Sequence, residues 1–247
     1  MLDVAPERSS CGLDRGGWTT IGATDAPFGR YASPVPASST VLQSVVDAFG
    51  AAAARAEAAG FDAIELHGAH GYLLHELLSP VTNTRDDEWS GSTTARERLL
   101  LVTVTAVRQH WPATKPLLVR LSVDDVAPGG STANDSVLLA QRLGDIGVDL
   151  IDCSTGGLVA GIDYDAFPGY QVPGSTTVRA GSGLPTSAVG LITSPTQAAE
   201  IIASGQADAV MLGRAMLRDP YWARHAAAEL GAVAQLVGVT RYHRAFS

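Results

Sequence analysis

The sequence predicts an α/β fold in which parallel strands alternate with helices, and it favours part of a (β/α)8 barrel. Three observations support this prediction. Short apolar segments alternate with longer segments of helical spacing, the helical segments carry end signals, and polar residues stand where the apolar segments end. Continuous apolar strands separated by helices are typical of a parallel sheet that other elements cover.

A long helix is the first regular element that we expect. Residues 1–38 are rich in Gly, Pro, Ser and Thr and lack periodicity, which predicts an irregular lead-in. We expect residues 39–247 to form a partial-barrel domain. Its opening Ala-rich stretch has Ser38 or Ser39 as N-cap and Gly60 just past its end, which indicates one helix.

Further along the chain, short apolar runs alternate with segments of helical spacing. The apolar runs have the pattern of buried strands and are FDAIELHG (61–68), PLLVRLS (116–122), VDLIDCS (148–154), PTSAVG (185–190) and ADAVMLG (207–213). The helical segments between them are TTARERLLLVTVTAVRQHW (93–111), NDSVLLAQRLGDIG (134–147) and SPTQAAEIIASG (194–205). The sequence therefore predicts about five β/α units.

Polar residues at strand ends favour a barrel over an open sheet. His67, Arg120, Ser154, Gly190 and Arg214 each lie at or after the carboxyl end of a different predicted strand. A barrel gathers such positions on one face, whereas an open sheet brings together only those near its switch point. A closed barrel needs eight strands, so we expect a partial barrel.

Two histidines and a tyrosine follow the first predicted strand of the sheet. His67 and His70 stand three residues apart, and Tyr72 comes two residues later. The imidazoles could bind metal, hold a substrate oxygen, or pack in the core. A metal site needs a third ligand, and no Cys, Asp or Glu nearby has an obvious spacing for it. Imidazole N–H donors suit a carbonyl or nitro oxygen, and a phenol can deliver a proton.

Arg120 lies within the apolar run LLVRLS. Burying a guanidinium is unfavourable unless it meets an anion or an electron-rich ring. The alternative is an ion pair with a carboxylate such as Glu65 or Asp152. The residues alone leave these two interpretations open.

Two glycine sites follow the last two predicted strands. They are Val189-Gly190-Leu191 and Leu212-Gly213-Arg214. In a barrel these two loops often bind a phosphate through backbone N–H groups and a helix N-terminus. The sequence contains neither GxGxxG nor GxxxxGK[ST], so it indicates neither a dinucleotide fold nor a P-loop.

Composition excludes several classes of partner. The net charge is −8, which disfavours nucleic acid because phosphate neutralisation needs clustered Lys and Arg. No run of about 18 apolar residues occurs, so we expect no membrane span. The two cysteines, Cys11 and Cys153, are too few for a disulfide framework, and the amino terminus lacks an apolar signal region. We therefore expect a cytoplasmic protein.

Several long motifs follow one another in order from Gly17 to the end of the chain. They are FDAIELHGAHGYLLHELLSPVTNTRDDEWSGS, LLVRLSVDD, LIDCSTGGL, FPGYQVP, SAVGLIT and MLGRAMLRDPYW. Together they resemble the NADH:flavin oxidoreductases of the Old Yellow Enzyme family, and most of all its bacterial thermophilic-like ene-reductases. The resemblance implies an FMN-binding TIM barrel. In that family NAD(P)H reduces the flavin, which then passes a hydride to the β-carbon of an activated alkene.

The same resemblance implies roles for individual residues. His67 and His70 would hold the electron-withdrawing group of the substrate, and Tyr72 would donate the proton. Arg120 would contact the flavin ring. The residues implied at the FMN phosphate are Gly190, Gly213 and Arg214. In the terminal motif RYHRAF, Arg244 takes the place of an arginine that reaches a neighbouring subunit, which implies a homo-oligomer; a solvated tail is the alternative.

The family's first three strands have no counterpart among the predicted ones. From this we expect the chain alone to bind FMN weakly or not at all, because one wall of the flavin site would be absent. A catalytically silent partial barrel is therefore an alternative to an active ene-reductase. A zinc hydrolase that uses His67 and His70 is a third hypothesis, which bound metal would support.

Overall fold

The central sheet has the parallel order that the sequence predicts. The computed structural model describes residues 15–236. Within that range five strands form one sheet, and every neighbouring pair is parallel. Their order in space follows their order in the chain, so each connection crosses over through other elements. The strands are, in sheet order, β3 (Ile64–Gly68), β4 (Leu117–Ser122), β5 (Leu150–Ser154), β6 (Thr186–Ala188) and β7 (Ala209–Val210).

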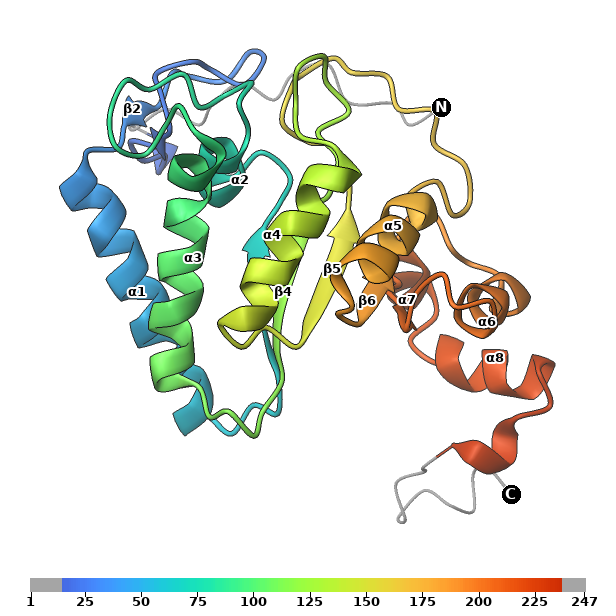
Figure 1. Ribbon diagram of the computed structural model, residues 1–247. Coiled ribbons are helices and arrows are strands. Elements are labelled where there is room, and N and C mark those ends of the chain that lie inside the picture. The colour runs from blue at the N-terminus through green and yellow to red at the C-terminus, as the bar shows by residue number, and fades with distance from the viewer. Residues whose placement is uncertain (1–14, 237–247) are drawn as a thin grey trace.

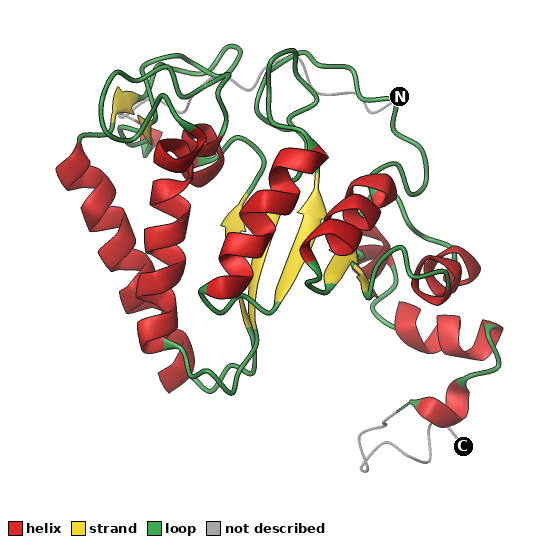
Figure 2. Cartoon of the chain, in the orientation of Figure 1, coloured by secondary structure: helices red, strands yellow, loops and turns green. Residues whose placement is uncertain are grey.

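The longer helices lie side by side along the sheet. The helices are α1 (Ser39–Ala58), α2 (Leu73–Leu78), α3 (Thr93–His110), α4 (Ala133–Asp145), α5 (Val172–Ser182), α6 (Pro195–Ala203), α7 (Arg214–Arg218) and α8 (Trp222–Glu229), followed by the 3-10 turn η2 (Val233–Gln235). In Figure 1, α4 and α5 stand before the strands, α3 lies beside them and α1 lies beyond α3, and consecutive members of this row contact one another. Figure 2 shows the same layering, with red helices in front of yellow strands.

The N-cap of α1 is Ser38, one of the two serines that the sequence offers. Its hydroxyl accepts a hydrogen bond from the Val41 N–H at 3.3 Å. Ser39 has a different role: its hydroxyl donates to Glu88 at 3.2 Å and accepts from the Trp89 indole at 3.0 Å. The helix ends at Ala58, close to the predicted stop.

We expect Ser38→Ala to lower the free energy of unfolding by about 1 kcal/mol, because an N–H of the first turn loses its acceptor. Ser44→Ala is the matched control, since the Ser44 hydroxyl only donates to the Val41 carbonyl inside the same helix. Denaturant unfolding followed by circular dichroism measures both variants. Equal losses would mean that the cap contributes nothing.

The sequence patterns missed α5, whose segment VPGSTTVRAGS contains helix-disfavouring proline and glycines. Packing accounts for two of these glycines. A Cβ at Gly174 would lie 2.8 Å from Val123 Cγ2, and one at Gly181 would lie 2.7 Å from Val137 Cγ1. The missing side chains allow α5 to approach α4 and the loop after β4. The short helices α2, α7 and α8 were also not predicted.

The described part of the lead-in is anchored on α2. It is mostly loop, with one two-residue parallel pair between β1 (Ile21–Gly22) and β2 (Val35–Pro36). The Ala23 N–H donates to the Glu76 carboxylate at 3.0 Å, and Arg85 donates to the Ala23 carbonyl at 2.7 Å.

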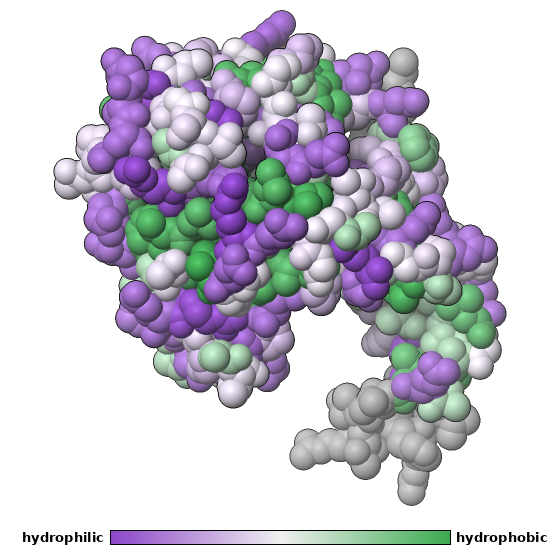
Figure 3. Space-filling view, viewed as in Figure 1, coloured by the Kyte–Doolittle hydropathy of each residue, from purple (hydrophilic) through white to green (hydrophobic). Residues whose placement is uncertain are grey.

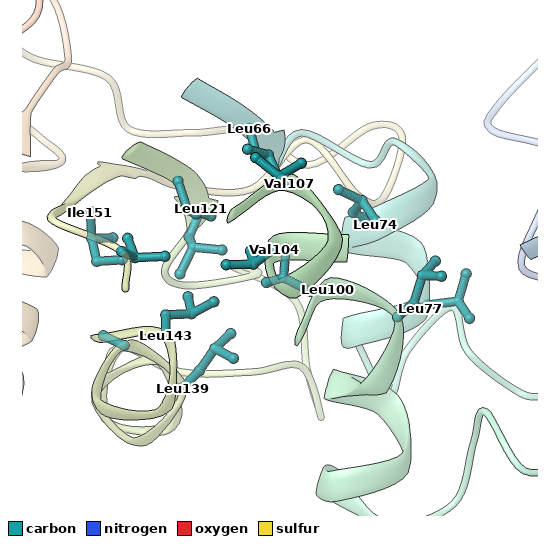
Figure 4. Close-up of a cluster of buried hydrophobic side chains, with 14 of the residues drawn as sticks. Leu66, Leu74, Leu77, Leu100, Val104, Val107, Leu121, Leu139, Leu143 and Ile151 are labelled. Atoms are coloured by element: carbon teal, nitrogen blue, oxygen red, sulfur yellow. The ribbon is translucent and has the colours of Figure 1, made fainter. Parts of the chain in front are cut away.

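Alternate strand residues pack against the helices and build the main core. Side chains from β3, β4 and β5 meet side chains from α2, α3 and α4 (Figure 4). Burying each such leucine or isoleucine contributes about 1.5–3 kcal/mol. The residues labelled there are Leu66, Leu74, Leu77, Leu100, Val104, Val107, Leu121, Leu139, Leu143 and Ile151.

The strand register also creates a polar row. It pairs His67 with Arg120, Arg120 with Asp152, and Asp152 with Ser187. Successive strand residues point to opposite faces, so this row lies on the face away from the core leucines. The row brings the predicted histidine and arginine onto neighbouring strands.

The surface seen over the helices is mixed in character. Figure 3 shows hydrophilic side chains interspersed with hydrophobic patches on this face. Between residues 15 and 236, none of the helices combines the length and the apolar composition that a membrane crossing requires.

Candidate active site

A cavity of about 370 Å³ opens at the carboxyl ends of the strands. Its wall includes residues that the sequence singled out on five different strands or the loops after them. These are His70, Arg120, Ser154, Gly190, Gly213 and Arg214. The structure therefore brings them together, as the strand-end pattern predicts.

His67 and Tyr72 lie beside this cavity. The His67 ring centroid is 5.0 Å from that of His70 and 5.6 Å from that of Tyr72. Tyr72 is 66 % exposed, so its phenol is accessible from solvent. The two imidazoles and the phenol form one group at the edge of the cavity.

Both imidazoles are held in the neutral form at neutral pH. Burial, together with the positive charge of Arg120, lowers the pKa of His67. The same two causes lower the pKa of His70 to about 4. A neutral imidazole carries one N–H, so each ring has one donor for a ligand. The His70 Nε2 lies 2.6 Å from the Ser154 hydroxyl.

Arg120 forms the ion pair that the sequence left open, and its partner is Asp152. Arg120 Nε lies 3.1 Å from Asp152 Oδ2, but the N–H does not point at this oxygen, so neither atom has a hydrogen-bond partner in the described chain. The Ser187 hydroxyl donates to Asp152 Oδ1 at 2.7 Å. Burial raises the pKa of Asp152, and Ser187 and Arg120 oppose that rise. Arg120 also lines the cavity, so the same guanidinium can face a ligand as well as Asp152.

The glycine loops shape the far end of the cavity. Gly190 has φ 122°, which residues with a side chain rarely adopt, and Leu191 also has a positive φ of 53°. A Cβ at Gly190 would lie 3.1 Å from the Tyr170 ring, whereas one at Gly213 would meet no atom within 4 Å. Gly190 is therefore required by the fold, and Gly213 leaves its backbone open to the cavity.

Sequence reasoning missed several residues of this wall. Tyr170, Gln171 and Arg218 all line the cavity. The Gln171 amide donates to the Tyr170 hydroxyl, while its Oε1 is buried without a hydrogen-bond partner in the described chain. The motif FPGYQVP contained both Tyr170 and Gln171, but nothing in its composition indicated that they reach a ligand.

Two further expectations from the sequence concern Arg244 and a metal site. Arg244 falls outside the described residues 15–236. Within that range, no three His, Cys, Asp or Glu side chains gather in a way that could hold a metal ion.

Comparison with known families identifies the chain. Residues 22–232 match the sequence model of the NADH:flavin oxidoreductase / NADH oxidase family. This chain belongs to that family. The resemblance drawn from the motifs is therefore confirmed.

Members of this family from bacteria are similar over most of the chain. The NADPH dehydrogenase of Geobacillus thermodenitrificans is 46% identical over 213 residues, which cover 85% of this chain and 62% of that protein. The NADPH dehydrogenase of Listeria monocytogenes serotype 4a is 44% identical over 217 residues, which cover 88% of this chain and 63% of that protein. The chain thus spans less than two thirds of the length of these relatives.

Solved structures confirm the barrel architecture. A complex of 2-naphthoyl-CoA reductase aligns with a TM-score of 0.79 and 24% identity over 88% of this chain and 34% of that one. A morphinone reductase variant in complex with tetrahydroNAD aligns with a TM-score of 0.69 and 21% identity over 87% of this chain and 61% of that one. The five β/α units described above therefore match the parallel α/β fold of TIM-barrel oxidoreductases.

Proposed function

We propose that this chain functions as an FMN-dependent NAD(P)H oxidoreductase that reduces activated alkenes. The observation that carries the proposal is the single cavity that joins His70 and Arg120 to the glycine loops at Gly190 and Gly213. Family membership and the relatives named NADPH dehydrogenase support the same class of reaction. The activity of the whole protein is part of the proposal, because the chain spans less than two thirds of those relatives.

The cavity suits a flavin nucleotide. Its volume of about 370 Å³ falls within the usual range for ligand sites. Arg214 and Arg218, with the open backbone at Gly213, offer charged and neutral donors to a phosphate. At the other end, Arg120 lines the cavity, and those of its five N–H donors that do not face Asp152 can reach an electron-rich ring edge.

The residues beside the cavity suit the substrate. Bound FMN would supply hydride transfer from NAD(P)H to the β-carbon of the alkene. His67 and His70 would donate hydrogen bonds to the carbonyl or nitro oxygen, where negative charge develops in the transition state. Tyr72 would then donate its proton to the α-carbon.

Ser154 would set the tautomer of His70. Its hydroxyl lies 2.6 Å from His70 Nε2. If that hydroxyl donates, the proton of the neutral imidazole resides on Nδ1 and is free for the substrate oxygen. The 2 % exposure of Ser154 protects this contact from competing water.

Titration of the purified chain with FMN, followed by flavin fluorescence and absorbance, tests the proposal. We expect Arg214→Ala to weaken FMN binding by about 10–100-fold, because a charge-assisted hydrogen bond to the phosphate is lost. Arg55→Ala removes an equal charge from an exposed position of α1 and serves as control. Equal effects of the two variants would contradict the proposed site, whereas a lack of saturable binding would favour the alternative of a catalytically silent partial barrel. The same titration tests the expectation of weak FMN binding.

We also propose a cytoplasmic homo-oligomer. Cys153 is a buried free thiol, as suits a reducing compartment. Leu217 and Tyr221 are 83 % and 61 % exposed, and exposed apolar side chains of this size suit a contact with a second copy.

A further inference from the structure

The turn that carries His70 has a backbone conformation that its surroundings must hold. His70 has φ 59° and Gly71 has φ 74°. The left-handed region costs a residue with a Cβ about 1–2 kcal/mol. His70 therefore stays in it only because other contacts determine the backbone.

Ser122 holds the first N–H group of this turn. The His70 N–H donates to the Ser122 hydroxyl at 3.1 Å, and that hydroxyl donates in turn to the Gly156 carbonyl at 2.8 Å. Ser122 is buried at the end of β4. One side chain thus connects the His70 turn to the loop after β5.

His75 holds the second N–H group. The Gly71 N–H donates to His75 Nδ1 at 3.0 Å, and His75 Nε2 lies 2.8 Å from Asp125 Oδ1. Because Nδ1 accepts a hydrogen bond, the hydrogen-bond network assigns the neutral tautomer with its proton on Nε2. His75 is 2 % exposed and Asp125 is fully buried, so water does not replace either contact.

Asp125 is itself fixed from the other side. Its Oδ2 accepts from the Ser79 hydroxyl and from the Ser131 N–H, each at 2.7 Å. Burial alone would raise the pKa of Asp125, but the hydrogen bonds from His75, Ser79 and Ser131 lower it. A charged, fully hydrogen-bonded carboxylate orients the imidazole that it accepts from, as it does for histidines in catalytic sites.

We infer that His75, oriented by Asp125, and Ser122 are positioning residues that fix the backbone of His70 and Gly71 and so aim the His70 imidazole at the cavity. The inference rests on the proposed function for the role of His70. His75 is buried and does not line the cavity, but by this inference it supports substrate binding as well as packing.

Histidine NMR titration of the full chain without FMN tests this inference. The pKa of His70 is near 4 because burial lowers it, together with the positive charge of Arg120. A ring that leaves this place gains water, so its pKa rises toward about 6.5. We expect a rise to above about 5 in His75→Leu and in Ser122→Ala, each of which removes an acceptor of the turn.

His75→Gln is the conservative variant, because an amide has both an acceptor for Gly71 and a donor for Asp125. We expect it to keep the pKa of His70 near 4. His110→Leu removes an imidazole from an exposed site on α3 and should leave the value unchanged. Melting temperatures, measured in parallel, report how much stability each change costs.

Three outcomes are decisive. The inference is supported if the pKa of His70 rises in His75→Leu and Ser122→Ala but stays unchanged in His75→Gln. An equal rise in His75→Gln and His75→Leu would overturn it, because the imidazole itself and not its hydrogen bonds would then matter. An unchanged pKa in folded Ser122→Ala would overturn it as well, and that variant decides alone if His75→Leu does not fold. Because the titration contains no flavin, its result can be interpreted even if the chain does not bind FMN.

Discussion

His67→Ala should slow the oxidation of the reduced, FMN-loaded protein by an enone about 10²–10³-fold. The histidine would donate to the substrate oxygen, on which charge develops only in this half-reaction. Reduction of the flavin by NAD(P)H should change far less. Stopped-flow absorbance at the flavin bands measures the two half-reactions separately.

The comparison of half-reactions separates catalysis from support of the fold. The His67 ring centroid lies 5.0 Å from that of His70. Burial and the positive charge of Arg120 lower the pKa of His67, so its imidazole is a neutral hydrogen-bond donor at pH 7. If His67→Ala slowed both half-reactions equally, the histidine would only stabilise the site. His110→Ala, on the exposed face of α3, is the matched control and should alter neither rate.

The site residues that follow the strands could be predicted from the sequence pattern alone. Parallel strands in a barrel present their carboxyl ends on one face, so finding the strands also places the residues that follow them. His70, Arg120 and Gly213 share a cavity for this reason. The helices around them were predicted where caps and apolar spacing were regular, as in α1 and α4.

Other parts of the site depend on packing that a single sequence does not express. Tyr170 and Gln171 reach the cavity from a loop with no periodicity. The hydrogen bond between His75 and Asp125 joins residues 50 positions apart. Within LLHELL, His75 has the pattern of an ordinary helix residue, and only the fold shows that its ring meets the Gly71 N–H.

Arg120 shows that a sequence pattern can place a residue at a strand end without determining which partner its side chain contacts. The sequence allowed either an ion pair or a ligand contact. Register places Asp152 beside Arg120 on the next strand, and the cavity opens on the same guanidinium. A carboxylate on one side and a ligand on the other are compatible, since a guanidinium has five N–H donors.

Gly71→Ala should have the largest effect on stability of the changes considered. The residue has φ 74°, and a Cβ there would overlap the carbonyl oxygen of Gly157. Gly157 is also tightly packed from its own side, since its Cβ would lie 2.8 Å from the His70 Cα. The two turns therefore pack backbone against backbone, and neither atom belongs to a side chain that can rotate away.

We expect Gly71→Ala to lower the free energy of unfolding by more than about 4 kcal/mol, a size that marks a specific steric defect. Gly60→Ala is the matched control: Gly60 has φ 81°, but a Cβ there meets no atom within 4 Å. Gly60→Ala should lower the free energy of unfolding by only about 1–2 kcal/mol, the cost of a left-handed backbone for a residue with a Cβ. Denaturant unfolding of both variants gives the comparison. If the two losses were equal, the His70 and Gly157 turns would be free to separate, and the backbone that aims His70 would be less rigid than its hydrogen bonds imply.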